Sequence, residues 1–272
     1  MYFNIPLDTF KELSRSICKL DKGQSDTGTG FFLRAKFDGK HIYLLITAQH
    51  FIPFALVDVR KKIDIIADNG NLKQEIILNN NERKILCFLD KDITAIEILE
   101  KDMIRHKVKF LKYDKNCKYD FYKNYLGKFA FTYPQPDGKD LKFHYGRILA
   151  VGTPRNFEFH HNLETQKGSS GAPIFVIKQS LKRSSPKPRV IGVHTSCDPN
   201  SKLNIGTFIN VLIEKLKHGI DNLVYEKKII MPKNSEMVVP SGTCLTFNYL
   251  SVTGNSSITL KGNVRLNVGC NP

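Results

Sequence analysis

The sequence predicts an all-β protein built from two six-stranded antiparallel barrels, and three observations support this prediction. Short apolar stretches rich in β-branched residues follow one another along the chain, and turn-forming pairs such as Asp38-Gly39 and Asn69-Gly70 separate them. These stretches fall into two sets on either side of residues 101–126, a segment rich in Lys, Tyr and Asp. Six strands within about seventy residues are typical of one closed antiparallel barrel.

The same pattern locates the strands of the two predicted barrels. The first set comprises residues 30–36, 41–47, 63–67, 74–78, 85–89 and 93–99. The second set includes residues 128–133, 142–152, 172–177, 190–194 and 206–210. Residues 181–189 combine prolines with lysines and arginines, and they therefore predict an exposed hairpin loop.

A short helix is predicted at each end of this β-rich region. Residues 8–20 place apolar side chains three and four positions apart, and Thr9 with Glu12 offers a capping box at the start. We expect this helix to cover the end of a barrel, with docking to a partner as the alternative. Residues 211–218 predict the second helix, which Gly219 closes as a C-cap.

The predicted elements divide the chain into four parts. They are an N-terminal helix (1–24), a first barrel (25–120), a second barrel (121–222) and a β-rich C-terminal extension (223–272). Polar and apolar residues alternate within the extension over residues 257–260 and 264–268. We therefore expect a further β-hairpin or a small β appendage there.

The chain is strongly basic, with 41 Lys and Arg residues against 26 Asp and Glu residues and a formal net charge of +15. Such a charge is compatible with binding to nucleic acid or to an anionic surface. However, the basic residues are spread from Lys11 to Arg265 among many Ile and Asn residues. We therefore attribute the charge to overall composition, and we do not favour nucleic acid or an anionic surface as a partner.

The six cysteines have no spacing typical of a metal site, and nothing in the sequence indicates a metal or another cofactor. Free buried thiols are expected in a reducing compartment, whereas Cys244 and Cys270 could pair in an oxidising one. No stretch approaches the ~20 apolar residues needed to span a membrane. Residues 1–20 lack the pattern of a secretion signal, so a complete chain would act inside a cell, in the cytoplasm. The sequence would look the same if a signal or propeptide had been removed, and the protein would then be secreted.

Three segments carry the residue types of nucleophilic catalysis, each at the edge of a predicted strand. His50 follows Ile46-Thr47-Ala48-Gln49, Asp92 opens the apolar run Asp92-Ile93-Thr94-Ala95-Ile96, and Ser170 lies in the turn Gly168-Ser169-Ser170-Gly171-Ala172-Pro173. A serine hydroxyl becomes a good nucleophile when an imidazole removes its proton. A carboxylate then fixes the tautomer of that imidazole.

The order His, Asp, Ser and these local segments resemble the chymotrypsin-like (trypsin-like, PA clan) serine peptidases. The resemblance covers roughly residues 25–220. It implies a base, an orienting acid and a nucleophile, which are His50, Asp92 and Ser170 respectively. It also implies that the backbone N–H groups of Gly168 and Ser170 form an oxyanion hole.

Two of these assignments have a rival nearby. Ser169 adjoins Ser170, but the Gly-x-Ser-Gly-x-Pro frame puts Ser170 in the nucleophile position of the family. Asp90 lies two residues before Asp92. We choose Asp92 because an aspartate followed directly by an aliphatic strand matches the family pattern.

Within this group the chain looks most like the glutamyl endopeptidases, over residues 165–175, 190–194 and 204–210. In that family a threonine five residues before the nucleophile and a histidine on the next strand line the specificity pocket. The picornavirus-type proteases use the same pair to hold glutamine. Thr165 and His194 occupy these positions, and a hydroxyl with an imidazole N–H can bind a carboxylate or amide oxygen. The resemblance therefore implies a serine endopeptidase that cleaves a protein or peptide substrate after Glu or Gln through an acyl-enzyme.

The chain departs from this family at other positions near the predicted pocket. Lys167 stands where a glycine is common, and it could supply positive charge to a bound carboxylate. His160 and His161 could also face the pocket, although we expect them in a turn or at a barrel rim.

Three other interpretations stay open on the sequence. Glu164, six residues before Ser170, could select Lys or Arg, as a carboxylate at that place does in trypsin-like enzymes. The barrels could instead form a catalytically silent binding module for a protein or a nucleic acid. An active enzyme could also be blocked by its N-terminal helix or by residues 235–272.

Overall fold

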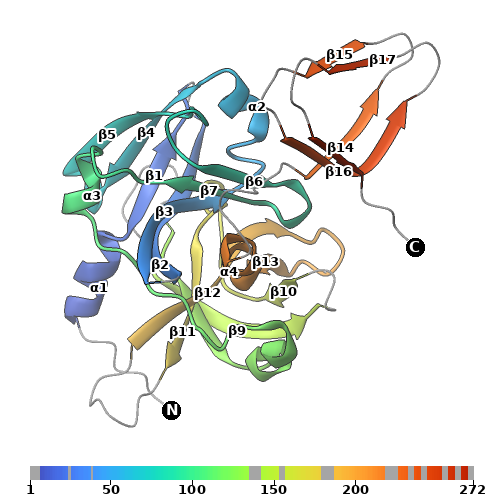
Figure 1. Ribbon diagram of the computed structural model, residues 1–272. Coiled ribbons are helices and arrows are strands. Elements are labelled where there is room, and N and C mark those ends of the chain that lie inside the picture. The colour runs from blue at the N-terminus through green and yellow to red at the C-terminus, as the bar shows by residue number, and fades with distance from the viewer. Residues whose placement is uncertain are drawn as a thin grey trace. The chain divides into compact units, whose positions relative to one another are not determined.

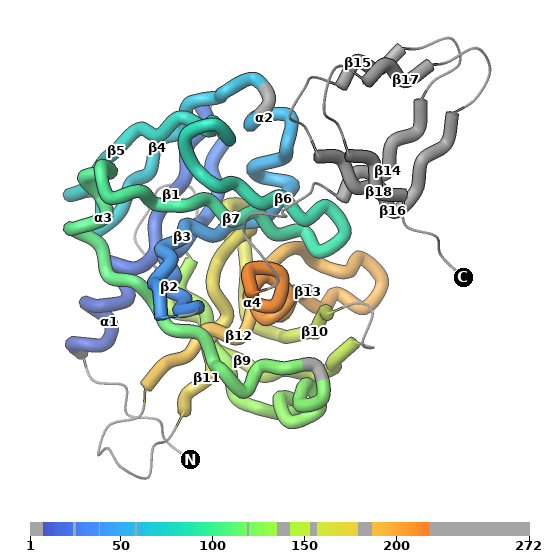
Figure 2. The backbone as a smooth tube through the Cα atoms, in the orientation of Figure 1, coloured from blue at the N-terminus to red at the C-terminus, as the bar shows by residue number. Residues whose placement is uncertain are grey.

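The computed structural model divides the chain into two compact units, Met1–Lys217 and His218–Pro272. In the first unit the described residues are 7–23, 26–37, 39–134, 142–152, 157–178 and 187–217. In the second unit they are the strand residues 226–231, 236–239, 244–252, 257–260 and 265–268. Figure 1 shows these elements, and Figure 2 traces the backbone of the first unit from blue to orange.

The N-terminal half of the first unit is one antiparallel sheet of seven strands in the order β5-β4-β1-β2-β3-β7-β6. Its elements are α1 (Leu7–Ser14), β1 (Ile17–Asp21), β2 (Thr27–Phe37), β3 (Lys40–Ala48), α2 (Phe54–Asp58), β4 (Lys62–Ala67), η1 (Asp68–Gly70), β5 (Leu72–Ile77), β6 (Ile85–Phe88), η2 (Leu89–Lys91) and β7 (Ile93–Glu97). The sheet curls into a half-barrel (Figure 1). All six predicted strands are present, but the prediction of a closed six-stranded barrel in this half is wrong.

The seventh strand is β1, which the sequence pattern assigned to a helix over residues 8–20. Helix α1 ends at Ser14, where the hydroxyls of Ser14 and Ser16 donate hydrogen bonds to carbonyls of the last helical turn. β1 then pairs with β2 on one side and with β4 on the other. Ile17 and Leu20 are consequently buried in the core of the sheet. A spacing of three residues is typical of a helix and puts the two side chains on opposite faces of a strand, so only the pairing of β1 with two neighbouring strands reveals the strand.

The C-terminal half of the first unit is a closed six-stranded barrel in the order β10-β13-β12-β11-β8-β9, which confirms the prediction for this half. Its strands are β8 (Phe129–Thr132), β9 (His144–Val151), β10 (Glu158–His161), β11 (Pro173–Lys178), β12 (Lys187–Cys197) and β13 (Asn204–Phe208). Helix α4 (Asn210–Lys217) follows, as predicted. Of the predicted loop over residues 181–189, residues 187–189 belong to β12 and the rest lies outside the described residues.

Strand β10 was absent from the sequence prediction because it is short and has only one strongly apolar residue, Phe159. In the structure β10 pairs with β9 on one edge and with β13 on the other, and this pairing closes the barrel. Phe159 and His161 are both fully buried on its inner side. Long-range pairing therefore fixes a strand that local propensity does not indicate.

The segment between the halves contains α3 (Ile104–Lys107) and a short 3-10 helix, η3 (Tyr119–Tyr125). It also adds two single parallel bridges, one from Leu111 to Leu33 in β2 and one from Tyr113 to Val190 in β12. The predicted linker is therefore paired to both halves.

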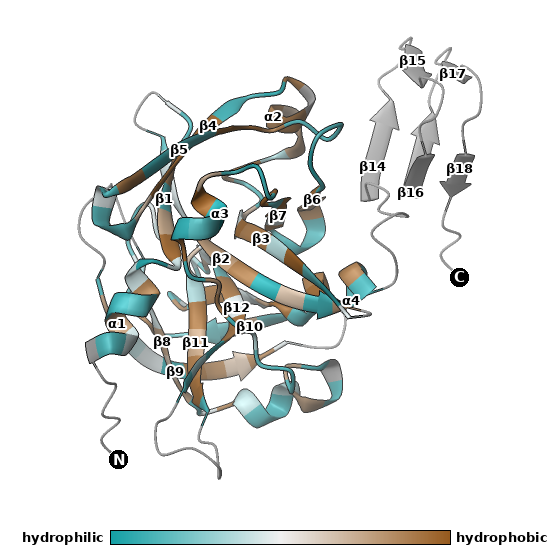
Figure 3. Ribbon diagram, turned by 60° about the vertical axis from the view of Figure 1, so that its left-hand side comes forward, coloured by the Kyte–Doolittle hydropathy of each residue, from teal (hydrophilic) through white to brown (hydrophobic). Residues whose placement is uncertain are grey.

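Each half has its own hydrophobic core. Phe32, Leu45 and Ile96 belong to the core of the sheet, and Phe159 and Phe208 belong to the core of the barrel. Figure 3 shows apolar residues concentrated in strands such as β3 and β11, whereas α1 and α3 are mostly hydrophilic. No helix among the described residues is long and apolar enough to cross a membrane.

The second unit contains five strands among its described residues. They are β14 (Glu226–Met231), β15 (Glu236–Val239), β16 (Cys244–Val252), β17 (Ser257–Leu260) and β18 (Arg265–Val268). All their pairings are parallel: β14-β16-β18 form one sheet and β15-β17 another. Among these strands β17 pairs with β15 and β18 pairs with β16, and the expectation of a β-hairpin or small β appendage stays a prediction. Cys270 lies outside the described residues, and so does its suggested pairing with Cys244.

Candidate active site

His50 and Asp92 are brought together by neighbouring strands of the curled sheet. β3 pairs with β7 so that Ala48 lies opposite Ile93, and the residues that extend each strand therefore meet. Nδ1 of His50 lies 2.8 Å from one carboxylate oxygen of Asp92, and the backbone N–H of His50 donates to the other at 2.7 Å. The backbone N–H of Gln49 also donates to the Asp92 carbonyl. Two contacts with the carboxylate and one between backbones thus hold the imidazole in one orientation.

The rival residue Asp90 does not reach His50. Its carboxylate, which is about half exposed, binds the ammonium group of Lys91 at 2.8 Å. Asp92 has a left-handed backbone conformation (φ 50°, ψ 43°), which aspartate tolerates better than most residues and which ends the turn just before β7. The geometry therefore selects Asp92 over Asp90 as the partner of His50.

The His50 ring is half exposed, and its contact with Asp92 determines its protonation. A carboxylate can only accept hydrogen bonds, so the proton of the neutral ring is on Nδ1 and Nε2 is free to accept another proton. The hydrogen bond to Asp92 raises the pKa of His50 above the ordinary value, and partial burial opposes this shift. The free lone pair of the neutral ring is thus on Nε2.

The turn that carries Ser170 docks against the other half of the unit. Gly168 and Gly171 both have positive φ values, 86° and 88°. A Cβ atom at Gly171 would lie 2.1 Å from the carbonyl oxygen of Thr29 and 2.4 Å from the hydroxyl of Thr47, so no other residue fits there. Thr29 donates its N–H to the Ser170 carbonyl and its hydroxyl to the Gly168 carbonyl. Thr47 donates to the carbonyl of Thr29 in turn.

The two adjacent serines have different environments. Ser169 is fully buried, and its hydroxyl accepts a hydrogen bond from the N–H of Gln166. Ser170 is only half-buried. In the described part of the chain no hydrogen bond joins Ser170 to His50, and the N–H groups of Gly168 and Ser170 are unengaged. Catalytic hydrogen bonds often form fully only when substrate is present, and free N–H groups are what an oxyanion hole requires.

Two buried histidines lie next to the candidate catalytic residues. His194 in β12 is 5% exposed, and burial lowers its pKa to about 4. His161 in β10 is fully buried, and burial holds its pKa well below the ordinary value. The two rings meet edge to face with centroids 5.4 Å apart. Both rings are therefore neutral at pH 7.

Hydrogen bonding of these rings is incomplete. Nδ1 of His161 accepts the N–H of Leu163 at 3.3 Å, so the proton of this ring is on Nε2. Among the described residues, Nε2 of His161 and Nδ1 of His194 are buried without a hydrogen-bond partner. Unpaired buried polar atoms are rare and mark a position where a ligand or water is expected. His161 was expected in a turn or at a barrel rim, so its burial beside His194 is a difference from expectation.

Thr165 donates its hydroxyl to Oδ1 of Asn204 at 2.8 Å. The amide of Asn204 donates in turn to the carbonyl of Leu163 at 2.6 Å. Asn204 is the first residue of β13, directly opposite His161 in β10. Neither Asn204 nor the threonines that support the Ser170 turn has a recognisable sequence signal, because each acts through contacts between distant segments.

Glu164, the alternative specificity residue, points to solvent. Its side chain is 84% exposed, and its carboxylate lies 3.4 Å from Nδ1 of His144. A carboxylate that selects Lys or Arg needs to face the pocket in a shielded position. This geometry gives no support to the interpretation in which Glu164 selects a basic residue.

No three His, Cys, Asp or Glu side chains of the described residues are grouped so that they could hold a metal ion. Cys18 and Cys117 are buried, and burial raises the pKa of both thiols, which makes them unreactive. The polar chemistry of the site therefore resides in the histidines, Asp92, Ser170 and the backbone N–H groups.

The curled sheet, the closed barrel and the position of this site between them define the chymotrypsin-like protease fold. Among solved structures, Deg5 superimposes with a TM-score of 0.51 at 17% identity, over 76% of this chain and 90% of Deg5. A serine endoprotease from Yersinia pestis gives 0.54 at 13% identity, over 80% of this chain and 69% of that one. The HtrA-type protease AlgW in a complex with a tripeptide gives 0.53 at 12% identity, over 78% and 62%.

These identities are low, so the similarity establishes the fold and not the activity. No family model and no curated protein sequence matches the chain.

Proposed function

We propose that the protein is a serine endopeptidase in which Ser170 is the nucleophile, His50 the general base and Asp92 the residue that orients His50. The observation that carries this proposal is the His50–Asp92 hydrogen bond, which leaves Nε2 as the proton acceptor beside the docked Ser170 turn. The chymotrypsin-like fold supports it. The similar structure of AlgW, which was determined with a tripeptide, supports it as well.

In this mechanism Nε2 of His50 accepts the proton of the Ser170 hydroxyl as Oγ attacks the scissile carbonyl carbon. The carbonyl oxygen takes up the electron pair, and the N–H groups of Gly168 and Ser170 donate hydrogen bonds to it. His50 then passes the proton to the leaving amine as the C–N bond breaks, which leaves an ester on Ser170. A water molecule then attacks the acyl carbon as His50 accepts its proton; the ester C–O bond breaks, the acid product leaves, and His50 returns the proton to Oγ of Ser170.

A comparison of two single variants tests this proposal. We expect Ser170→Ala to abolish labelling by a fluorophosphonate and cleavage of a peptide library, a loss of about 10⁶-fold in kcat. The neighbouring Ser169→Ala is the matched control and should keep both, provided that circular dichroism shows it to be folded. Folded wild-type protein that is never labelled, or labelling that survives in Ser170→Ala, would contradict the proposal.

We further propose that Thr165 and His194 bind the side chain of Glu or Gln before the scissile bond, with Gln preferred at neutral pH. His194 and His161 are both neutral, so nothing in this buried pair offsets the charge of a carboxylate. A glutamine amide carries no charge and meets no such penalty. The Thr165 hydroxyl can turn from Asn204 to the oxygen of either side chain.

This preference predicts a particular pH dependence. A glutamate side chain binds here only with an added proton, on itself or on His194, and its binding therefore weakens as pH rises. Glutamine binding takes up no proton. For two peptides that differ only at this position, the Gln-to-Glu ratio of kcat/KM should rise by up to about tenfold per pH unit above about pH 5.

The titration of His50 affects both peptides equally and cancels in the ratio. His194→Ala should remove the selectivity, whereas His160→Ala, on the same strand as His161, should retain it. A preference for Glu at every pH, or a ratio that does not change with pH, would exclude a neutral pocket. Loss of a Glu preference in Lys167→Ala would identify Lys167 as the source of positive charge instead.

A further inference from the structure

A cavity of about 740 Å³ lies between the segment that joins the two halves, the end of β11 and helix α4. Its volume is in the range of small-molecule sites in proteins. Six lysines line it: Lys36, Lys115, Lys118, Lys128, Lys178 and Lys217. Only two carboxylates, Asp114 and Glu214, accompany them. The lining of the cavity thus carries an excess of positive over negative charge.

Both carboxylates are already paired with lysines of the cavity. Asp114 binds Lys178 at 2.6 Å, and Glu214 binds Lys217 at 2.7 Å. Within the described residues the other four lysines, Lys36, Lys115, Lys118 and Lys128, make no ion pair. A cavity with four unpaired ammonium groups attracts an anion with several charges, such as a chain of phosphate groups.

The cavity also offers aromatic surface. Phe121 lines the cavity and is 48% exposed, so its ring is accessible to a ligand. Tyr113 is half-buried at the same cavity, and Tyr125 lies below the ammonium group of Lys128 at 5.0 Å. Aromatic rings beside lysines suit a ligand that combines a planar base with phosphates.

Hydrogen bonds fix the position of Asp114 in the lining of the cavity. Asp114 is buried and accepts hydrogen bonds from the hydroxyl of Tyr125 at 3.0 Å, the N–H of Asn116 at 3.0 Å and the ammonium group of Lys178. Burial alone would raise the pKa of Asp114, but these three donors outweigh burial and lower it. Asp114 therefore stays ionised and holds Lys178 in place at neutral pH.

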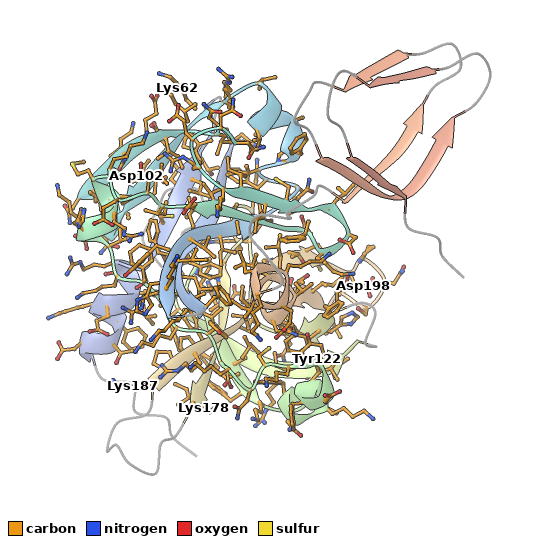
Figure 4. The ribbon with its side chains drawn as sticks, viewed as in Figure 1. Lys62, Asp102, Tyr122, Lys178, Lys187 and Asp198 are labelled. Atoms are coloured by element: carbon orange, nitrogen blue, oxygen red, sulfur yellow. The ribbon has the colours of Figure 1, made fainter. Side chains whose placement is uncertain are left out.

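The cavity is separate from the candidate active site. β11 begins at Pro173, three residues after Ser170. It ends at Lys178, which is labelled in Figure 4. The antiparallel pairing of β11 with β12 puts Lys178 opposite Lys187 and puts Pro173 opposite Val193, beside His194. A ligand in the cavity would thus lie at the far end of these two strands from Ser170.

We propose that this cavity binds a nucleotide, with its phosphates on the four unpaired lysines and its base against Phe121 and Tyr113. The binding does not depend on peptidase activity. It can be measured on the full chain carrying Ser170→Ala, so failure of this proposal and failure of the proposed function are distinguishable.

Isothermal titration with ATP, adenosine and tripolyphosphate, in EDTA, tests the proposal. ATP should bind, adenosine and tripolyphosphate should each bind at least about tenfold more weakly, and the affinity for ATP should fall as salt is raised. Phe121→Ala should weaken ATP binding and leave tripolyphosphate binding unchanged. A tripolyphosphate affinity equal to that of ATP would overturn the proposal, because it would make the cavity a simple anion site.

A pair of charge-matched double variants locates the binding. Lys118→Glu with Lys128→Glu should weaken ATP binding by at least about tenfold. Lys61→Glu with Lys107→Glu makes the same change in net charge on exposed lysines outside the cavity, and it should have little effect. Equal losses in both variants would assign the affinity to overall charge and contradict the cavity. Binding of a single-stranded RNA oligomer by protein that does not bind ATP would also overturn it.

Discussion

Asp92→Asn should lower kcat by about 10⁴-fold while leaving the fold intact, because an amide can donate a hydrogen bond where the carboxylate only accepts. With an amide facing Nδ1 of His50, the imidazole can hold its proton on Nε2 and thereby lose the atom that accepts the serine proton. The backbone N–H of His50 keeps an acceptor in the side-chain carbonyl oxygen of the new amide, so the loop geometry is preserved. The loss should therefore appear in kcat rather than in stability.

Asp90→Asn is the matched control, since it makes the same chemical change two residues away on a carboxylate that binds Lys91. Its activity should stay close to that of the wild type. The pH profile adds a second measurement. Asp92 raises the pKa of His50, so the fall of kcat/KM at acidic pH should occur in the wild type above the ordinary histidine pKa. In Asp92→Asn this fall should move to lower pH. Comparable losses in both variants, or a fall at unchanged pH, would refute the assigned role of Asp92.

Asp102→Ala should lower the free energy of unfolding of the first unit by about 3–5 kcal/mol, which is typical for breaking a buried ion pair. Asp102, labelled in Figure 4, binds the two terminal nitrogens of Arg83 at 2.8 Å and 3.1 Å, and both side chains are 5% exposed. Asp102 also accepts the N–H of Leu99. Without the carboxylate, the Arg83 guanidinium would remain buried and unpaired.

Thermal unfolding followed by circular dichroism measures this effect, and the melting temperature should fall by roughly 10 °C. Glu82→Ala removes the partner of Lys101 in an exposed pair and should have little effect on the melting temperature. The double variant Arg83→Leu with Asp102→Leu should recover much of the loss, because it removes the unpaired charge. A double variant as unstable as Asp102→Ala would contradict this explanation.

The strands of the first unit were largely predictable because alternation and turn residues are local signals. The two failures have a common cause. Ile17 and Leu20 have the spacing of a helical stripe although β1 is a strand buried on both faces, and β10 has one strongly apolar residue. In both places pairing with two distant strands decides the outcome. Long-range pairing also decides that the first sheet does not close into a barrel. This outcome depends on how all seven strands pair and not on the sequence of any one strand.

The candidate site also combines residues that local sequence suggests with residues that only long-range contacts reveal. The prediction of His50, Asp92 and Ser170 rests on short local segments, and of this prediction the structure shows the contact of Asp92 with His50. Thr29, Thr47 and Asn204 were missed because an ordinary threonine or asparagine acquires its role only when remote segments meet. The burial of His161 beside His194 required the barrel to close around β10.

The docking of the Ser170 turn onto Thr29 also has a consequence for the order in which the site is assembled during synthesis. The contact between His50 and Asp92 spans 42 residues, whereas the contact between Thr29 and Gly168 spans 139. The base can therefore be oriented while the barrel strands are still being made. The nucleophile turn acquires its shape only after the barrel has emerged and joined the sheet. Under the proposed mechanism, peptidase activity therefore begins only after the two halves have docked.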